Sequence, residues 1–278
     1  MAITKRLAAG VVTAKNGLNG GVELSAAGSS VLSTSDLNPS SGYFCHLWAG
    51  SSGNGDGYLP DISGALAHAQ FAAGLTKALA WANPGFATSA TAANNQGFIL
   101  PTLNFDYAAG ESLILVWKGR GTPPASTKVF IGDSPSSGTQ GFAVRVDATG
   151  KIQMYLSDGA GTFGDFTTNV LMESGVTHTY ALAIDGLARK YEQHEDGVVV
   201  RSIITLGAGG SINCRAARAV TLGSGEQPTM FSTNAVAVQT QSLVILRGRA
   251  GQGLPTNYRA LMQRIAASPD RLVSQSDW

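Results

Sequence analysis

Asp-Gly pairs set between runs of β-branched and aromatic residues constrain this chain more than any other feature. Asp-Gly is typical of tight turns between antiparallel strands, because both turn positions take positive φ angles. Further turn signals separate the neighbouring runs, so the segment from about Leu47 to Arg247 is predicted to be a series of antiparallel hairpins. The pairs and the further turn signals are Asp158-Gly159, Asp185-Gly186, Asp196-Gly197, Gly132-Asp133 and Thr149-Gly150.

The runs between these turns have the patterns of strands. Leu103–Tyr107 alternates apolar and polar residues, whereas Leu113–Trp117 is continuously apolar and predicts a strand buried on both faces. No helical pattern separates the runs, which excludes βαβ units. Charged residues make up 13% of the chain and there are 35 glycines, which suits short strands and many turns. We expect an all-β fold, an antiparallel jelly-roll sandwich of the concanavalin A-like kind.

The two ends differ from this pattern. Residues 1–40 are rich in small polar residues and are predicted to form an N-terminal arm or hairpin, an anchor for assembly. Residues 41–278 would form the sandwich, with a short C-terminal helix at about 255–267. Tyr258, Leu261, Met262 and Ile265 give that helix an apolar stripe, Thr256 or Asn257 a cap, and Ser268-Pro269 its end. For residues 65–82, strand and loop are favoured over a helix.

The charge pattern limits the classes of function. The net charge is +1 and no basic stripe occurs, so no nucleic-acid partner is expected. No apolar run is long enough for a membrane span, and the short apolar stretch after Lys5-Arg6 lacks a persuasive cleavage site. A chain with few charges and nearly no net charge is poorly soluble as a monomer, so we expect a homo-oligomer or a larger assembly.

Cys45 and Cys214 are expected to be reduced, buried thiols.

No set of catalytic residues is complete in the sequence. Glu192, Glu195 and Asp196 lack the spacing of paired glycosidase carboxylates and are interpreted as a solvated hairpin turn. Gly132-Asp133-Ser134 resembles the nucleophile block of GDS-type esterases, but the blocks that supply the base and the oxyanion hole are missing. The chain is therefore expected not to be an enzyme.

The sequence does contain candidate binding residues. Trp48 and Tyr58 flank a loop rich in Gly, Asn and Asp and are the candidate carbohydrate-binding residues, although they also suit core or interface positions. No cofactor is expected, and the histidines and cysteines lack the spacing of a zinc site. Ca²⁺ remains open, because aspartates are expected in several loops: Asp133, Asp147, Asp158 and Asp165.

Several short motifs resemble the laminin-G-like domains of the concanavalin A-like lectin and glucanase group. They are Leu59–Gly64, His68–Phe71, Gly175–Gly186 and Tyr191–Val198, although Thr177 stands where that family has tryptophan. The resemblance covers about residues 59–272. The group includes lectins, glucanases, adhesion domains and many bacteriophage virion proteins, and the small-residue composition and the N-terminal arm are similar to the phage members.

The resemblance implies two hypotheses. In the first, the chain is a non-catalytic structural or adhesion protein of a bacteriophage virion, a capsid decoration or a tail-associated protein held by other virion proteins through residues 1–40. In the second, it is a carbohydrate-binding module that recognises a bacterial surface glycan. The first hypothesis places the protein in the virion, and the second fits a secreted or cell-surface location.

Overall fold

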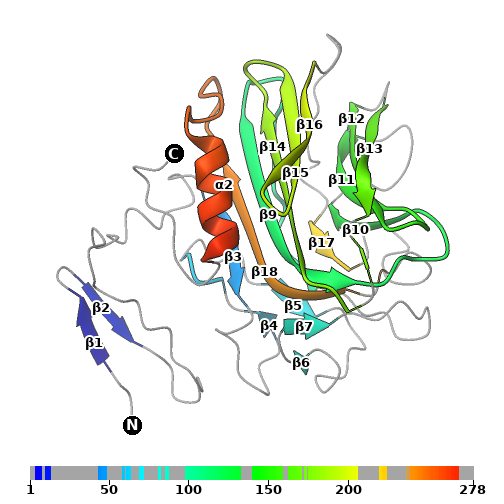
Figure 1. The fold of residues 1–278 in the computed structure, drawn as a ribbon. Coiled ribbons are helices and arrows are strands. Elements are labelled where there is room, and N and C mark those ends of the chain that lie inside the picture. Colours follow the sequence, from blue (N-terminus) through cyan, green and yellow to red (C-terminus); the bar gives the residue numbers. More distant parts are fainter. Residues whose placement is uncertain are drawn as a thin grey trace.

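The computed structural model describes most of the segment from Phe98 to Ser268 and shorter pieces before it. Within the described residues, the backbone forms two antiparallel sheets, a separate two-stranded hairpin and one helix (Figure 1). The described residues are 4–7, 10–13, 43–48, 58–59, 61–63, 69–71, 81–82, 85–87, 98–132, 140–158, 162–170, 172–173, 175–205, 219–223, 236 and 238–268.

The first sheet has the strand order β13-β12-β11-β10-β17-β8-β5-β4. Its longer strands come from the middle of the chain, where hairpins follow one another directly. Its strands are β4 (Tyr58–Leu59), β5 (Ala69–Phe71), β8 (Phe98–Ile99), β10 (Lys128–Gly132), β11 (Gln140–Val146), β12 (Lys151–Asp158), β13 (Thr162–Val170) and β17 (Thr221–Leu222).

The second sheet has the order β16-β15-β14-β9-β18-β7-β6, and β3 also pairs with β18. One edge of β18 pairs with β9, and the other pairs with β7 and then with β3. Its strands are β3 (Tyr43–Trp48), β6 (Trp81–Ala82), β7 (Gly85–Ala87), β9 (Ser112–Gly121), β14 (His178–Asp185), β15 (Lys190–Glu195), β16 (Val198–Thr205) and β18 (Val238–Arg247).

The predicted all-β sandwich is therefore confirmed, whereas its jelly-roll and concanavalin A-like details stay predictions. The turn between β15 and β16 is the two-residue turn expected of Asp-Gly, with φ of 47° at Asp196 and 81° at Gly197. Asp185-Gly186 is different, because Gly186 opens a four-residue turn that closes with Arg189 at a φ of 53°. Within residues 65–82, the described pieces are the strands β5 and β6, as favoured over a helix.

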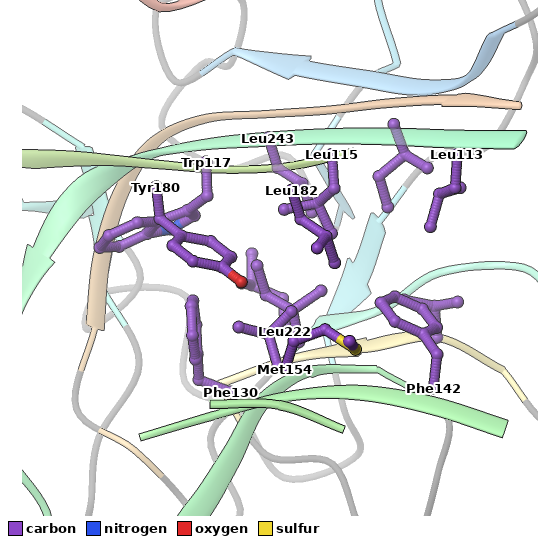
Figure 2. Close-up of a cluster of buried hydrophobic side chains, with 14 of the residues drawn as sticks. Leu113, Leu115, Trp117, Phe130, Phe142, Met154, Tyr180, Leu182, Leu222 and Leu243 are labelled. Carbon is purple, nitrogen blue, oxygen red and sulfur yellow. The ribbon is translucent and has the colours of Figure 1, made fainter. Parts of the chain in front are cut away.

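The main core lies between the two sheets. Figure 2 shows side chains of the second sheet, such as Leu115 and Trp117, facing those of the first, such as Phe130 and Met154. The Trp117 and Phe130 rings meet edge to face with centroids 5.4 Å apart. The indole N–H of Trp117 donates to the Thr240 hydroxyl at 2.9 Å, so this large side chain is buried without losing a hydrogen bond.

The other face of the second sheet carries the helix α2 (Tyr258–Ala267). Figure 1 shows α2 on the side of β9 and β18 that faces away from the first sheet. Leu261, Met262 and Ile265 pack there against Ile114 and Val116. The prediction that β9 is buried on both faces is thereby confirmed, as is the helix stripe.

The start of α2 is not capped as predicted. Asn257 is the N-cap residue, but its side chain makes no capping hydrogen bond. The backbone N–H of Tyr258 instead donates to the Pro255 carbonyl at 3.1 Å, which closes a turn directly before the helix. The helix ends at Ala267, as the Ser268-Pro269 signal predicted.

Near the beginning of the sandwich, Asp61 ties two segments together. Its Oδ1 accepts hydrogen bonds from the backbone N–H of His46 at 2.7 Å and from the N–H and hydroxyl of Ser63 at 3.0 and 2.7 Å. Cys45, beside this junction, is a free buried thiol, and burial with the nearby Asp61 charge raises its pKa well above the usual value. Cys214 lies outside the described residues.

At the N-terminal end, β1 (Thr4–Leu7) and β2 (Gly10–Thr13) form a hairpin of their own. It belongs to neither large sheet, which suits the predicted arm, although the boundary at residue 40 stays a prediction. Within the described part of the chain, no helix has the length and apolar character needed to cross a membrane.

Candidate functional site

The two aromatic residues predicted to bind sugar lie on neighbouring segments. Trp48 ends β3 in the second sheet and Tyr58 begins β4 in the first. An antiparallel bridge between Leu47 and Asp61 brings these segments together. The side chains of Trp48 and Tyr58 lie outside the described part of the structure, so their role in carbohydrate binding stays a prediction.

The acidic residues assigned to a solvated turn are instead in β15, which is a correction. Glu192 and Glu195 are 2% and 5% exposed, and only Asp196 belongs to the turn. Because side chains alternate along a strand, Glu192 faces α2 and Glu195 faces the other sheet. The sequence could not show this burial, because the covering groups come from elements far along the chain.

The outer group, beneath α2, consists of Glu192, His194, Tyr258 and Arg259. Glu192 Oε2 accepts from the Tyr258 hydroxyl at 2.9 Å and from an Arg259 guanidinium nitrogen at 2.6 Å. Glu192 Oε1 accepts from Arg259 Nε at 2.9 Å and also contacts His194 Nε2. Every polar atom of this carboxylate is therefore used inside the protein.

These contacts determine the ionisation of Glu192. Burial alone would raise its pKa, but the hydrogen bonds from Arg259, His194 and Tyr258 outweigh burial and lower it. A carboxylate that is charged and fully hydrogen-bonded in this way holds elements together and is a poor ligand site. We assign the outer group to the attachment of α2.

A second polar group lies on the opposite, core-facing side of the same strands. This inner polar cluster consists of His178 and Tyr180 of β14 with Gln193 and Glu195 of β15. Tyr180 pairs directly with Glu195 in the sheet, and its hydroxyl donates to Gln193 Oε1 at 2.8 Å. Burial, with the charge of Glu195, raises the pKa of Tyr180 well above its usual value, so the hydroxyl remains a donor.

Two nitrogen atoms of the inner polar cluster are buried without a hydrogen-bond partner in the described structure. They are Nε2 of Gln193 and Nε2 of His178. Buried polar atoms are nearly always satisfied, because leaving one unpaired costs about 1–3 kcal/mol. These two nitrogen atoms therefore keep unused hydrogen-bonding capacity, whereas the Glu192 carboxylate has none.

Exposure shows where this cluster meets the surface. Gln193 is 0% exposed and Glu195 5%, while the side chains of His178 and Asp196 are 16% and 53% exposed. His178 and Asp196 therefore lie at the surface end of these strands, beside the Asp196-Gly197 turn, whereas Gln193 lies in the interior. The apolar side chain of Val198, directly after that turn, is 64% exposed, so polar and apolar groups are neighbours at this surface.

The chemistry of the inner polar cluster follows from the groups that surround His178 in the described residues. In the described residues no serine, threonine or cysteine donates to Nε2 of His178, as an activated nucleophile would. Nor do three or more metal-ligating side chains gather there in a way that could hold a metal ion. The groups present are an imidazole, a phenol, an amide and a carboxylate, which are typical partners of ligand hydroxyls.

The aspartates considered for Ca²⁺ occupy different kinds of position. Asp147 lies in the turn after β11, where its Oδ1 accepts from the N–H and hydroxyl of Thr149 and the N–H of Lys151. Asp158 and Asp165 lie in β12 and β13, which corrects their assignment to loops. Asp133 and the side chains of Asp158 and Asp165 lie outside the described part, so Ca²⁺ binding stays an open prediction.

The sequence contained one signal for the contact between His178 of the inner polar cluster and Asp196. His178 opens the segment that ends in Asp185-Gly186, and Asp196-Gly197 follows the next strand, so a hairpin register brings His178 and Asp196 close together. The sequence could not show which face of β15 its polar side chains occupy, because both faces of this strand are covered.

No protein-family model matches this chain, and neither does any curated protein. Solved structures share its fold. The binding domain of Paraclostridial Mosquitocidal Protein 1 has a TM-score of 0.57 at 9% identity, covering 83% of this chain and 53% of the toxin chain. A botulinum neurotoxin type C structure has a TM-score of 0.57 at 11% identity, covering 85% and 53%.

A Trypanosoma rangeli sialidase matches with a TM-score of 0.54 at 15% identity, covering 82% of this chain and 33% of the sialidase. This chain therefore spans about half of the toxin chains and a third of the sialidase. At these identities the likeness shows the fold alone: an antiparallel β-sandwich that also occurs as part of larger binding and enzymatic proteins.

Proposed function

We propose that this protein is a non-catalytic, carbohydrate-binding β-sandwich that uses the inner polar cluster to hold a glycan. The observation that carries the proposal is the pair of buried, unpartnered nitrogen atoms on His178 and Gln193, of which His178 lies beside the partly exposed Asp196-Gly197 turn. Sugar hydroxyls both donate and accept hydrogen bonds, so they can satisfy an accepting nitrogen as well as a donating one.

Two further observations support this function. The exposed apolar side chain of Val198, directly after the Asp196-Gly197 turn, suits the C–H face of a sugar ring. The neurotoxin structure with the same fold concerns cell entry that depends on interaction with two ganglioside molecules, which are glycan-bearing lipids. The aromatic pair Trp48 and Tyr58 remains a proposed second contact surface for the same glycan.

A glycan array with the purified chain tests the proposal. We expect a signal from the wild type that falls at least about tenfold in His178→Ala, the effect of losing one or more hydrogen bonds. Leu187→Ala is the matched control, because Leu187 is exposed in the turn at the opposite end of β14. The control should bind like the wild type.

A blank array with folded wild-type protein would contradict carbohydrate binding. A signal lost in Trp48→Ala or Tyr58→Ala but unchanged in His178→Ala would move the site from the inner polar cluster to the aromatic pair. Circular dichroism of each variant separates a lost contact from a lost fold.

A second proposal concerns where such a module acts. The low charged fraction and near-zero net charge favour a chain held within an assembly, and the β1–β2 hairpin outside both large sheets suits an anchor. We propose a bacteriophage virion, with a structural or adhesion role on the capsid or tail and a homo-oligomeric state. Co-sedimentation with phage particles tests this: binding that requires residues 1–40 supports it, and no binding contradicts it.

A further inference from the structure

The turn after β15 fixes the position of one carboxylate very closely. Asp196 takes a φ of 47° in the two-residue turn, which places its side chain against the start of β14. Asp196 Oδ1 accepts the backbone N–H of Thr179 at 2.7 Å, and Oδ2 lies 2.7 Å from Nδ1 of His178. Its own backbone N–H donates to the Thr179 carbonyl at 2.9 Å.

This contact determines where the imidazole proton resides. An ionised carboxylate can only accept hydrogen bonds, so Nδ1 of the neutral ring carries the hydrogen. The other nitrogen, Nε2, then presents a lone pair, because the hydrogen bond at one ring nitrogen sets the state of the other. That lone pair belongs to the buried, unpartnered Nε2 of the inner polar cluster.

We propose that Asp196 is the positioning residue of this site: it holds His178 in the Nδ1–H tautomer so that Nε2 accepts a hydrogen bond from a hydroxyl group of the glycan. This inference rests on the proposed function and adds the direction of the hydrogen bond, with the glycan hydroxyl as donor and Nε2 of His178 as acceptor. A ligand group that can only accept hydrogen bonds, such as a carboxylate or an ether oxygen, would not satisfy Nε2. Selectivity at this point would therefore favour a free hydroxyl over its methyl ether.

The unpartnered amide of Gln193 provides an independent second feature. Its Nε2 can only donate, whereas Nε2 of His178 can only accept in this tautomer. Gln193 is fully buried, whereas the side chain of His178 is 16% exposed, so His178 is the residue that lies nearer the surface. We therefore assign the contact with the glycan hydroxyl to His178.

The test is Asp196→Asn, measured in two ways. Asparagine tolerates the left-handed φ of this turn position, so the hairpin is kept. Its amide can donate to Nδ1, which would move the ring hydrogen to Nε2 and remove the acceptor. Asp147→Asn is the control, because it also neutralises an aspartate of a hairpin turn, but in the first sheet.

Nitrogen-15 NMR of the histidine rings gives the tautomer without any ligand, and the glycan array gives binding. The inference is supported if the ring hydrogen of His178 is on Nδ1 in the wild type and in Asp147→Asn, but on Nε2 in Asp196→Asn. In addition, only Asp196→Asn should lose glycan binding, by about tenfold. An Nε2–H wild type, or an Asp196→Asn variant that binds normally, overturns it while carbohydrate binding stands. If the nitrogen-15 chemical shifts of His178 are as expected but the wild type binds no glycan on the array, the proposed function is overturned instead. The ligand contact inferred at Nε2 is then overturned with it.

Discussion

At the scale of single residues, Glu192 carries the polar attachment of α2 to the second sheet. Its two oxygens receive hydrogen bonds from Tyr258 and Arg259 and also contact His194. Removing one partner of such a buried group is costly because the remaining polar atoms stay buried without compensation. The stability of this region should therefore depend on pH through Glu192.

We expect Glu192→Gln to be less stable than the wild type by about 1–3 kcal/mol at pH 7. The folded pKa of Glu192 is lowered, so its contribution is present above the unfolded value of about 4.3 and is lost as the pH falls through the folded pKa. The difference between wild type and variant should therefore shrink as the pH falls below about 4.3. Urea unfolding across this range measures it.

Glu173→Gln is the control for this measurement, because Glu173 is exposed before β14. Its stability should follow that of the wild type at each pH. A Glu192→Gln deficit that stays constant down to pH 3 would contradict the role assigned to the ionised carboxylate.

At the scale of elements, the helix α2 covers the outer face of β9, β14 and β18 in the second sheet. Leu261 belongs to one apolar cluster with Met262 and the β9 side chains Ile114 and Val116. This second core is separate from the one between the sheets, and losing it would expose the outer face of β9.

Leu261→Ala should therefore lower the free energy of unfolding by about 2–5 kcal/mol, because it removes buried methyl groups and leaves a cavity. The neighbouring Gln263→Ala, on the exposed side of α2, should change it by less than about 0.5 kcal/mol. Thermal and urea unfolding of both variants compare them directly. Equal effects would show that α2 contributes little to the stability of the sheet.

Elements with a strong local pattern could be predicted from the sequence. Leu113–Trp117, the Asp196-Gly197 turn and the stripe of α2 each follow from periodicity or turn chemistry. The burial of Glu192 and Glu195 could not, because it depends on Tyr258 and Arg259 and on the opposite sheet. The candidate site was missed for the same reason: unpaired nitrogen atoms are a property of the packed structure.

At the scale of the whole molecule, the N-terminal hairpin and the sandwich form separate hydrogen-bonded units. β1 and β2 pair only with each other among the described strands. Their removal should therefore leave the two large sheets intact, if residues 1–40 serve as an arm.

We expect a variant that begins at residue 41 to keep the thermal unfolding midpoint of the full chain within about 4 °C, which corresponds to less than roughly 1–2 kcal/mol for a protein of this size. Its glycan binding should also remain, whereas its oligomeric state, measured by light scattering, should change if the arm is the anchor. A large loss of thermal stability would show that residues 1–40 belong to the sandwich.

The position of β18 in the middle of the second sheet has a consequence for biosynthesis. Leu243 of β18 pairs with Leu47 of β3 on one edge and with Trp117 of β9 on the other. A nascent chain that has not yet made β18 leaves these earlier strands without their shared neighbour, and contacts between residues so distant in sequence form slowly. Until translation passes Arg247, the edge of β9 that will receive β18 stays open, and a growing polypeptide in this state is exposed to chaperones and to aggregation with its neighbours on the same polysome.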